Sequence, residues 1–104
     1  MPLAHLALGS NLGDRWATLG AAVRRLRAEP GVRVVAVSPF YDTAPVGGPA
    51  GQGPYLNAAA AVETDLPPDH LLTLLHRIEH QFGRVRGVVD GPRTLDLDLL
   101  LYGD

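Results

Sequence analysis

The chain alternates between helical and strand-like segments, and the order of these segments restricts its fold more than any other feature. Apolar residues recur at spacings of three and four along 12–26 and again along 71–82, which is typical of helices that bury one face. Strands are predicted by short apolar or β-branched runs at 3–8, 32–41, 55–64 and 95–102. The order of elements is therefore β-α-β-β-α-β.

The helical stripes indicate which side chains should enter the core. They consist of Leu12, Trp16, Leu19, Val23 and Leu26 in the first helix, and of Leu71, Leu75, Ile78 and Phe82 in the second. Asp14 is expected to cap or open the first helix, and Pro30-Gly31 to stop it. Pro68 suits the first position of the second helix, and Gly83 should end that helix in the left-handed conformation.

Segments rich in glycine and proline are expected to lie outside regular structure. Residues 43–54 should form one long loop and 84–92 a second. Ser38-Pro39 interrupts the second strand, which we therefore place at or near a sheet edge. The segment 9–13 lacks the spacing of a dinucleotide-binding loop and should form a tight turn from strand to helix.

This order of elements is the split pattern of ferredoxin-like α+β sandwiches. Both helices would then cover one face of an antiparallel sheet and leave the other face free for a ligand. At 104 residues, the chain can supply one modest hydrophobic core but not two full domains. We therefore expect a single domain over 1–104.

Composition and charge exclude several function classes. The chain has no cysteine, which removes thiolate zinc sites and cysteine nucleophiles, and no lysine, which removes Schiff bases and a Walker-type phosphate lysine. A formal net charge of −2 argues against a nucleic-acid partner. No segment has the length and flanks of a signal peptide or a membrane span, so we expect a cytoplasmic protein without a membrane partner. We also expect a monomer.

The last strand segment, 95–102, carries the strongest chemical signal. Strand side chains alternate between faces, so Asp96 and Asp98 should lie side by side on one face. The odd-numbered leucines should face the helices, while Leu100 and Tyr102 should continue the acidic face as an apolar wall. Adjacent carboxylates repel each other, and a bound Mg²⁺ would remove that conflict. Two solvated acids on an exposed strand are the simpler alternative.

Arginines near this strand point toward a phosphate ligand. Arg93 lies just before the strand, and Arg84 and Arg86 lie in the same connecting segment. Guanidinium groups beside a metal-binding acid pair are the usual apparatus for a polyphosphate. Each arginine alone is a weak signal, because surface arginines often serve solubility only.

Several short motifs match one enzyme family, in the same order along nearly the whole chain. They are LGSNLG at 8–13, FYDTAP at 40–45, PYLNAA at 54–59, RIE at 77–79, GRVR at 83–86 and GPRTLDLDLLLYG at 91–103. In these motifs the chain closely resembles the 6-hydroxymethyl-7,8-dihydropterin pyrophosphokinases of folate biosynthesis. The resemblance implies a ferredoxin-like core and Mg²⁺-dependent transfer of pyrophosphate from ATP to the reduced pterin, with AMP released.

The resemblance also implies roles for individual residues. Asp96 and Asp98 match carboxylates that hold two Mg²⁺ ions, and Arg84 and Arg93 match arginines that contact the triphosphate, so these four are the candidate catalytic residues. The candidate ATP-binding residues are His76, Glu79, Arg84, Arg93 and Leu99. The candidate pterin-binding residues are Thr43, Ala44, Val46, Tyr55 and Asn57. His76 and Glu79, at i and i+3, are expected on one helix face.

Two departures from the family pattern bear on activity. The segment 87–90 lacks the family's usual tryptophan, which closes over the pterin. Family members also usually continue well past Gly103, and the resemblance implies that their distal segment adds groups at the ATP phosphates. Three hypotheses stay open: an active pyrophosphokinase, a degenerate module that binds ATP or pterin with little turnover, and an unrelated small ferredoxin-like enzyme such as an acylphosphatase.

Overall fold

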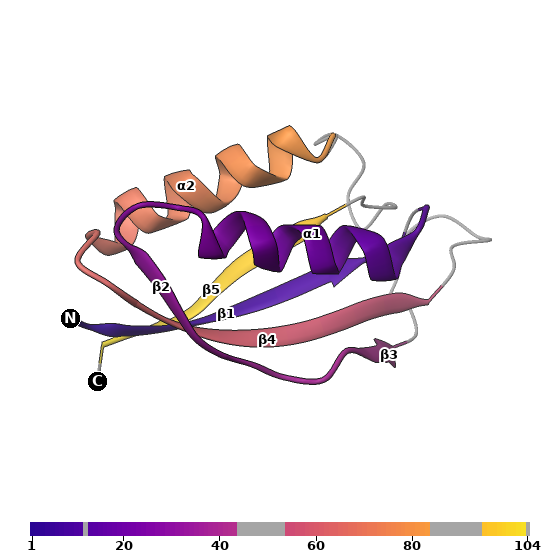
Figure 1. Cartoon of the computed structure of the whole chain (residues 1–104), viewed down its shortest axis with the longest axis horizontal. Coiled ribbons are helices and arrows are strands. Elements are labelled where there is room, and N and C mark those ends of the chain that lie inside the picture. Colours follow the sequence, from indigo (N-terminus) through magenta and orange to yellow (C-terminus); the bar gives the residue numbers. More distant parts are fainter. Residues whose placement is uncertain (12, 44–53, 84–94, 104) are drawn as a thin grey trace.

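The structure is a computed structural model, and it describes residues 1–11, 13–43, 54–83 and 95–103. Within these residues the chain forms two helices and five strands. They are β1 (Leu3–Ser10), α1 (Arg15–Arg27), β2 (Val32–Val37), β3 (Tyr41–Thr43), β4 (Tyr55–Thr64), α2 (Pro68–Gln81) and β5 (Asp96–Tyr102). Both helices lie against the same face of the sheet (Figure 1).

The strands form one antiparallel sheet in the order β2-β4-β1-β5, and the short β3 pairs with β4 as well. This arrangement confirms the predicted ferredoxin-like α+β sandwich. The additional feature is β3, which was not predicted as a separate strand. Neither α1 nor α2, at 13 and 14 residues, has the length and apolar character needed to cross a membrane.

The hydrophobic core lies between the helices and the sheet. Every second side chain of β1 and β4 points into it, and each helix contributes one face. Its largest buried members are Leu6, Leu8, Leu56, Val62, Leu95 and Leu97 from the strand segments and Leu19, Leu26, Leu71, Leu75 and Ile78 from the helices. Burial of these apolar surfaces drives the two layers together, and it fixes which face of each strand stays uncovered.

The helix ends follow the sequence prediction. The Asp14 carboxylate accepts a hydrogen bond from the Ala17 backbone N–H at 3.1 Å, which caps α1. Pro68 is the first residue of α2. Gly83 follows α2 with a φ of 79°, the left-handed conformation that favours glycine.

The predicted second strand, 32–41, is divided into β2 and β3. Ser38 lies between them and keeps the chain attached to β4: its N–H donates to the Ala59 carbonyl, and its hydroxyl accepts from the Ala59 N–H, both at 2.8 Å. Pro39 has no N–H to continue the ladder. Within β2 the register against β4 also shifts between Val34 and Ala36, which marks a bulge.

A second bulge, in β5, makes part of the predicted leucine alternation wrong. Leu6 pairs with Leu99 while His5 pairs with Leu101, so Leu100 is an extra residue in β5. Beyond it the faces exchange. Leu101 is 63% exposed, whereas Tyr102 packs against the core and donates its hydroxyl hydrogen to the Leu66 carbonyl. Tyr102 therefore does not extend the acidic face, and Leu101 does not face the helices.

Two further expectations are corrected in the first third of the chain. The helical spacing predicts Trp16 in the core stripe of α1, but this residue is 59% exposed. Its ring instead contacts Phe40 with a centroid separation of 5.4 Å. Gly9 was assigned to a tight turn, but β1 continues through Ser10 and places Gly9 within the sheet.

The bulge in β5 predicts opposite behaviour for two leucines of that strand. Leu97→Ala should lower the free energy of unfolding by about 2–5 kcal/mol, because its buried side chain would leave a cavity. Leu101→Ala should change it by less than about 0.5 kcal/mol, because that side chain is largely in solvent. Urea unfolding measures both, and equal losses would contradict the bulge.

Candidate functional site

The candidate functional site lies on the sheet face opposite the helices, along one row of paired residues. Gly9 of β1 pairs with Asp96 of β5 on one side and with Asn57 of β4 on the other, and Asn57 in turn pairs with Tyr41 of β3. Neighbouring strands lie about 4.8 Å apart, so the backbones of Asp96 and Asn57 are roughly 10 Å apart. Of the predicted metal-binding and pterin-binding residues that the structure describes, Asp96, Asp98, Thr43, Tyr55 and Asn57 thus lie on the same face of the sheet.

The acidic half of the site is on β5. Asp96 is half-buried and Asp98 is exposed, and both alternate with the buried Leu95 and Leu97. Asp98 pairs with Ala7, so small residues of β1 adjoin both acids. Among the residues that the structure describes, no group of three or more histidine, aspartate or glutamate side chains could hold a metal ion.

Two carboxylates are a donor set that suits Mg²⁺ bound together with a phosphate substrate. Mg²⁺ prefers oxygen ligands, keeps several waters, and is usually held by one or two carboxylates plus substrate phosphates. A closed cage of protein ligands is therefore not needed. Asp96 and Asp98 fit this kind of site because they project from adjacent positions on one strand face.

Glu79 supports the acidic strand from the helix layer. The residue is 1% exposed, and its carboxylate accepts a hydrogen bond from the Leu97 backbone N–H at 2.8 Å. Leu97 lies between the two aspartates, so this contact fixes the strand segment that carries them. His76, three residues earlier on α2, is exposed. Glu79 lies at the edge of the buried stripe of α2, and His76 lies just outside that stripe.

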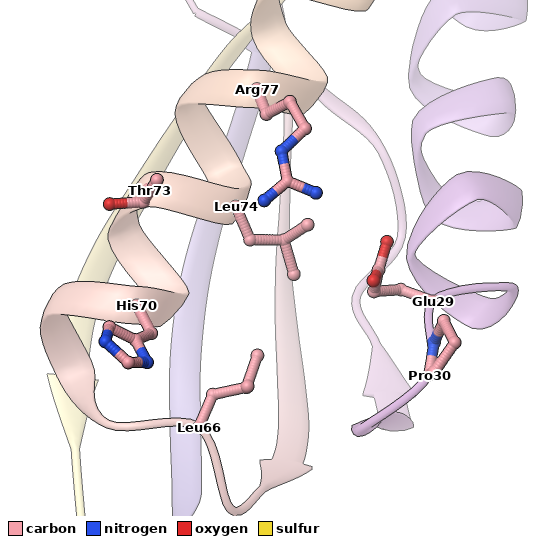
Figure 2. Close-up of a pocket in the computed structure, with 7 residues that line it drawn as sticks. All are labelled: Glu29, Pro30, Leu66, His70, Thr73, Leu74 and Arg77. Atoms are coloured by element: carbon pink, nitrogen blue, oxygen red, sulfur yellow. The ribbon is translucent and has the colours of Figure 1, made fainter.

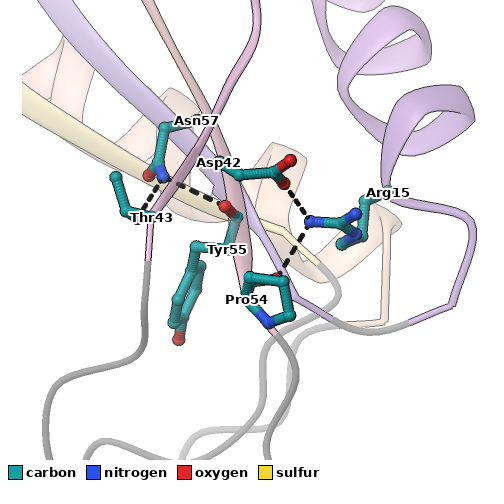
Figure 3. A network of polar contacts seen from close by, with 6 residues as sticks. All are labelled: Arg15, Asp42, Thr43, Pro54, Tyr55 and Asn57. Atoms are coloured by element: carbon teal, nitrogen blue, oxygen red, sulfur yellow. Dashed lines mark hydrogen bonds and ion pairs between the residues drawn. The ribbon is translucent and has the colours of Figure 1, made fainter.

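The polar half of the site is at the start of β4 (Figure 3). The Asn57 amide donates to the Thr43 hydroxyl at 2.6 Å and to the Tyr55 carbonyl at 3.4 Å. A Cβ added at Gly9 would come 3.2 Å from Asn57 Oδ1 and 3.5 Å from the Tyr55 ring. The amide oxygen and the ring are thus next to β1, and a side chain at position 9 would press against the amide oxygen.

Of the remaining predicted site residues, one is partly buried and the others lie outside the described residues. Leu99 packs against the core, on the opposite face from Asp98. Those outside the described residues are Ala44, Val46, Arg84, Arg86 and Arg93. The structure therefore brings Thr43, Tyr55 and Asn57 together, and aligns them with Asp96 across Gly9.

Sequence reasoning missed Gly9 and Arg15. The sequence analysis places Gly9 in a turn. A glycine directly after an apolar strand run can also indicate a strand position where a neighbouring side chain comes close to the backbone. The Arg15 guanidinium donates to Asp42 at 2.6 Å and to the Pro54 carbonyl at 3.0 Å (Figure 3). No spacing in the sequence indicates this contact, because its partners are 27 and 39 residues away.

A cavity of about 340 Å³ lies elsewhere, on the helix side of the molecule (Figure 2). It is lined by Glu29, Pro30, Leu66, His70, Thr73, Leu74 and Arg77. None of the predicted site residues lines it, and its Glu29 carboxylate already forms an ion pair with Arg25 at 2.7 Å. The open sheet face, rather than this cavity, carries the converging chemistry.

The fold and the site together define a class: a ferredoxin-like α+β domain whose uncovered sheet face bears a carboxylate pair two strands away from amide and hydroxyl groups. Residues 5–103 match the family model described as 7,8-dihydro-6-hydroxymethylpterin-pyrophosphokinase. The chain belongs to this family.

Curated relatives are similar to the chain over nearly its whole length. The chain is 49% identical to the 2-amino-4-hydroxy-6-hydroxymethyldihydropteridine pyrophosphokinase of Methylorubrum extorquens over 102 residues, which cover 98% of this chain and 64% of that protein. It is 47% identical to the proteins of the same name from Pseudomonas aeruginosa and Bacillus subtilis, in each case over 96% of this chain and 61% and 59% of theirs. The chain thus spans about three fifths of the length of these relatives.

The buried contact of Glu79 generates a prediction about stability. Glu79→Ala should lower the free energy of unfolding by about 1–3 kcal/mol, because it leaves the Leu97 N–H without this acceptor. His76→Ala is the matched control on the same helix and should stay within about 0.5 kcal/mol of the wild type. Denaturant unfolding and amide exchange at Leu97 measure the effect. Equal stability of the two variants would contradict the assignment.

Proposed function

We propose that the chain transfers pyrophosphate from ATP to 6-hydroxymethyl-7,8-dihydropterin in folate biosynthesis, giving the pterin diphosphate and AMP. One observation carries the proposal: Asp96, Gly9 and Asn57 form a single row across the open sheet face. A pterin at one end of this row and a magnesium triphosphate at the other would meet over Gly9. Membership in the family and the names of the relatives support the same reaction.

The polar half is suited to a pterin. The Thr43 hydroxyl accepts a hydrogen from the Asn57 amide nitrogen, which orients the amide so that its oxygen is turned toward β1. That oxygen can accept a hydrogen bond from the amino or ring N–H groups of a pterin. Tyr55 supplies an aromatic surface beside it. Ala44 and Val46 complete the proposed pterin site.

The acidic half is suited to the phosphates. Asp96 and Asp98 would hold Mg²⁺, with two ions expected, which would screen the charge of the triphosphate. Arg84 and Arg93 are the proposed guanidinium contacts to the phosphate oxygens. Glu79, through the Leu97 N–H, keeps the two aspartates in their places on β5. His76 and Leu99 are proposed to contact the nucleotide, Leu99 through its backbone because its side chain packs against the core.

The reaction then depends on positioning. The hydroxymethyl oxygen of the pterin attacks the β-phosphorus, the bond from that phosphorus to the oxygen bridging to the α-phosphate breaks, and AMP leaves with that oxygen. Residues at both ends of the row hold the two substrates in one orientation, which is a large part of catalysis for phosphoryl transfer. Cytoplasmic location and a monomeric state belong to the same proposal and rest on the sequence.

AMP formation tests this function directly. We expect AMP from ATP only when the hydroxymethyldihydropterin and Mg²⁺ are both present. Asp96→Asn should weaken binding of a non-hydrolysable ATP analogue in the presence of Mg²⁺ by about tenfold or more, on the order of 1.4 kcal/mol, as measured by calorimetry. Glu63→Gln removes a charge from the same sheet and is the control, which should bind like the wild type.

The outcomes separate the candidate functions. Binding of both substrates without AMP would identify a binding module with little turnover, and would overturn the proposed reaction. Nucleotide binding that is independent of Mg²⁺, or equally strong in Asp96→Asn, would contradict the role of the acid pair.

The glycine in the middle of the row gives an independent prediction. Gly9→Val places a branched side chain where even a Cβ comes 3.2 Å from Asn57 Oδ1, so the amide and the Tyr55 ring must move. We expect pterin affinity to fall by about tenfold or more while binding of the magnesium nucleotide is retained. Ala61→Val is the control, because Ala61 lies on the neighbouring strand β4 and pairs with His5 rather than with Gly9. Wild-type pterin affinity in Gly9→Val would contradict the proposed position of the pterin.

A further inference from the structure

The first turn of α1 contacts the region of β3 through two consecutive side chains. Arg15, the first residue of α1, donates from one guanidinium nitrogen to the Asp42 carboxylate at 2.6 Å and to the Pro54 carbonyl at 3.0 Å (Figure 3). The Trp16 ring contacts the Phe40 ring at 5.4 Å. We call this pair of residues, Arg15 and Trp16, the α1 clip.

The strand contacted by this clip is short and exposed. β3 is three residues long, and all three are exposed. Its described pairing is with β4 alone, through Tyr41, Asp42 and Thr43. A segment that buries so little apolar surface gains little from the hydrophobic effect. Contacts from outside the sheet can therefore add to the stability of β3 against β4.

Helix formation alone does not account for the two clip residues. A cation in the first turn is unfavourable, because the N-terminal end of a helix carries a partial positive charge. Trp16 leaves 59% of its surface in water, so the core does not require it either. The contacts with Asp42 and Phe40 give both residues a role. The Arg15 side chain is only 25% exposed, which limits solvent screening of its charge on that side of the pair.

We propose that Arg15 is a positioning residue for the pterin, acting through Asp42 and Thr43. By holding Asp42 of β3 and the carbonyl that precedes β4, Arg15 keeps Thr43 within 2.6 Å of the Asn57 amide. Thr43 in turn fixes the direction of the Asn57 oxygen that receives the pterin. Trp16 is the second contact of the clip. The inference deepens the proposed function and rests on it for the identity of the ligand.

The test uses charge-removing variants of the intact chain. Arg15→Met and Asp42→Asn should each weaken pterin binding about two- to fivefold, the range expected for a partly exposed ion pair, and should leave binding of the magnesium nucleotide unchanged. Arg33→Met is the matched control, because Arg33 forms an ion pair of the same length, 2.6 Å, with Glu63 across β2 and β4. It should bind pterin like the wild type.

A double-mutant cycle and fluorescence distinguish positioning from general destabilisation. The double variant should bind pterin no more weakly than Arg15→Met alone, since both changes break one contact. Trp16 is the only tryptophan of the chain, so its emission reports the clip directly. It should shift in Arg15→Met but not in Arg33→Met.

Each result decides the proposal. Wild-type pterin affinity in Arg15→Met, or additive losses in the double variant, would overturn it. If the wild type binds no pterin, the proposed function fails separately. The clip is then judged by Trp16 emission and by amide exchange of residues 41–43, and unchanged values in Arg15→Met would overturn it as well.

Discussion

Antiparallel pairing on both sides of β1 is the interaction on which the rest of the structure depends. β1 pairs with β4 over eight residues and with β5 along its other edge. Its alternation sends Leu6 and Leu8 into the core and turns Ala7 and Gly9 to the open face. The same register that closes the core therefore aligns Asp96 with Asn57. Folding and site geometry have one cause.

Much of this fold could be predicted from local patterns. Helical spacing, the Asp14 cap and the glycine at position 83 act within a few residues, so the sequence shows them directly. Bulges could not be predicted in this way. An extra residue such as Leu100 looks like any other apolar strand residue, and only pairing with β1 shows that one position is skipped. The faces of Leu101 and Tyr102 were wrong for that reason.

The site was predictable where one strand carries it, and less so where distant segments meet. Asp96 and Asp98 share a face by strand geometry alone. The Glu79 contact with Leu97 joins α2 to β5. Arg15 joins α1 to Asp42 of β3 and to Pro54, which precedes β4. Neither contact corresponds to a recognisable sequence motif, because its partners lie far apart in the chain. Family resemblance could mark Glu79 as a site residue, but its buried contact with the strand required the structure.

The two bulges also affect how readily the sheet edges of two molecules can pair. In the described part of the chain, β2 and β5 are the outer strands of the four-strand path β2-β4-β1-β5, and each contains a register shift, at Val34/Ala36 and at Leu100. Exposed strand edges are templates for pairing between molecules, and a bend or added twist makes them poorer templates. The two register shifts therefore make these edges poorer templates for pairing with a second molecule than regular strands would be.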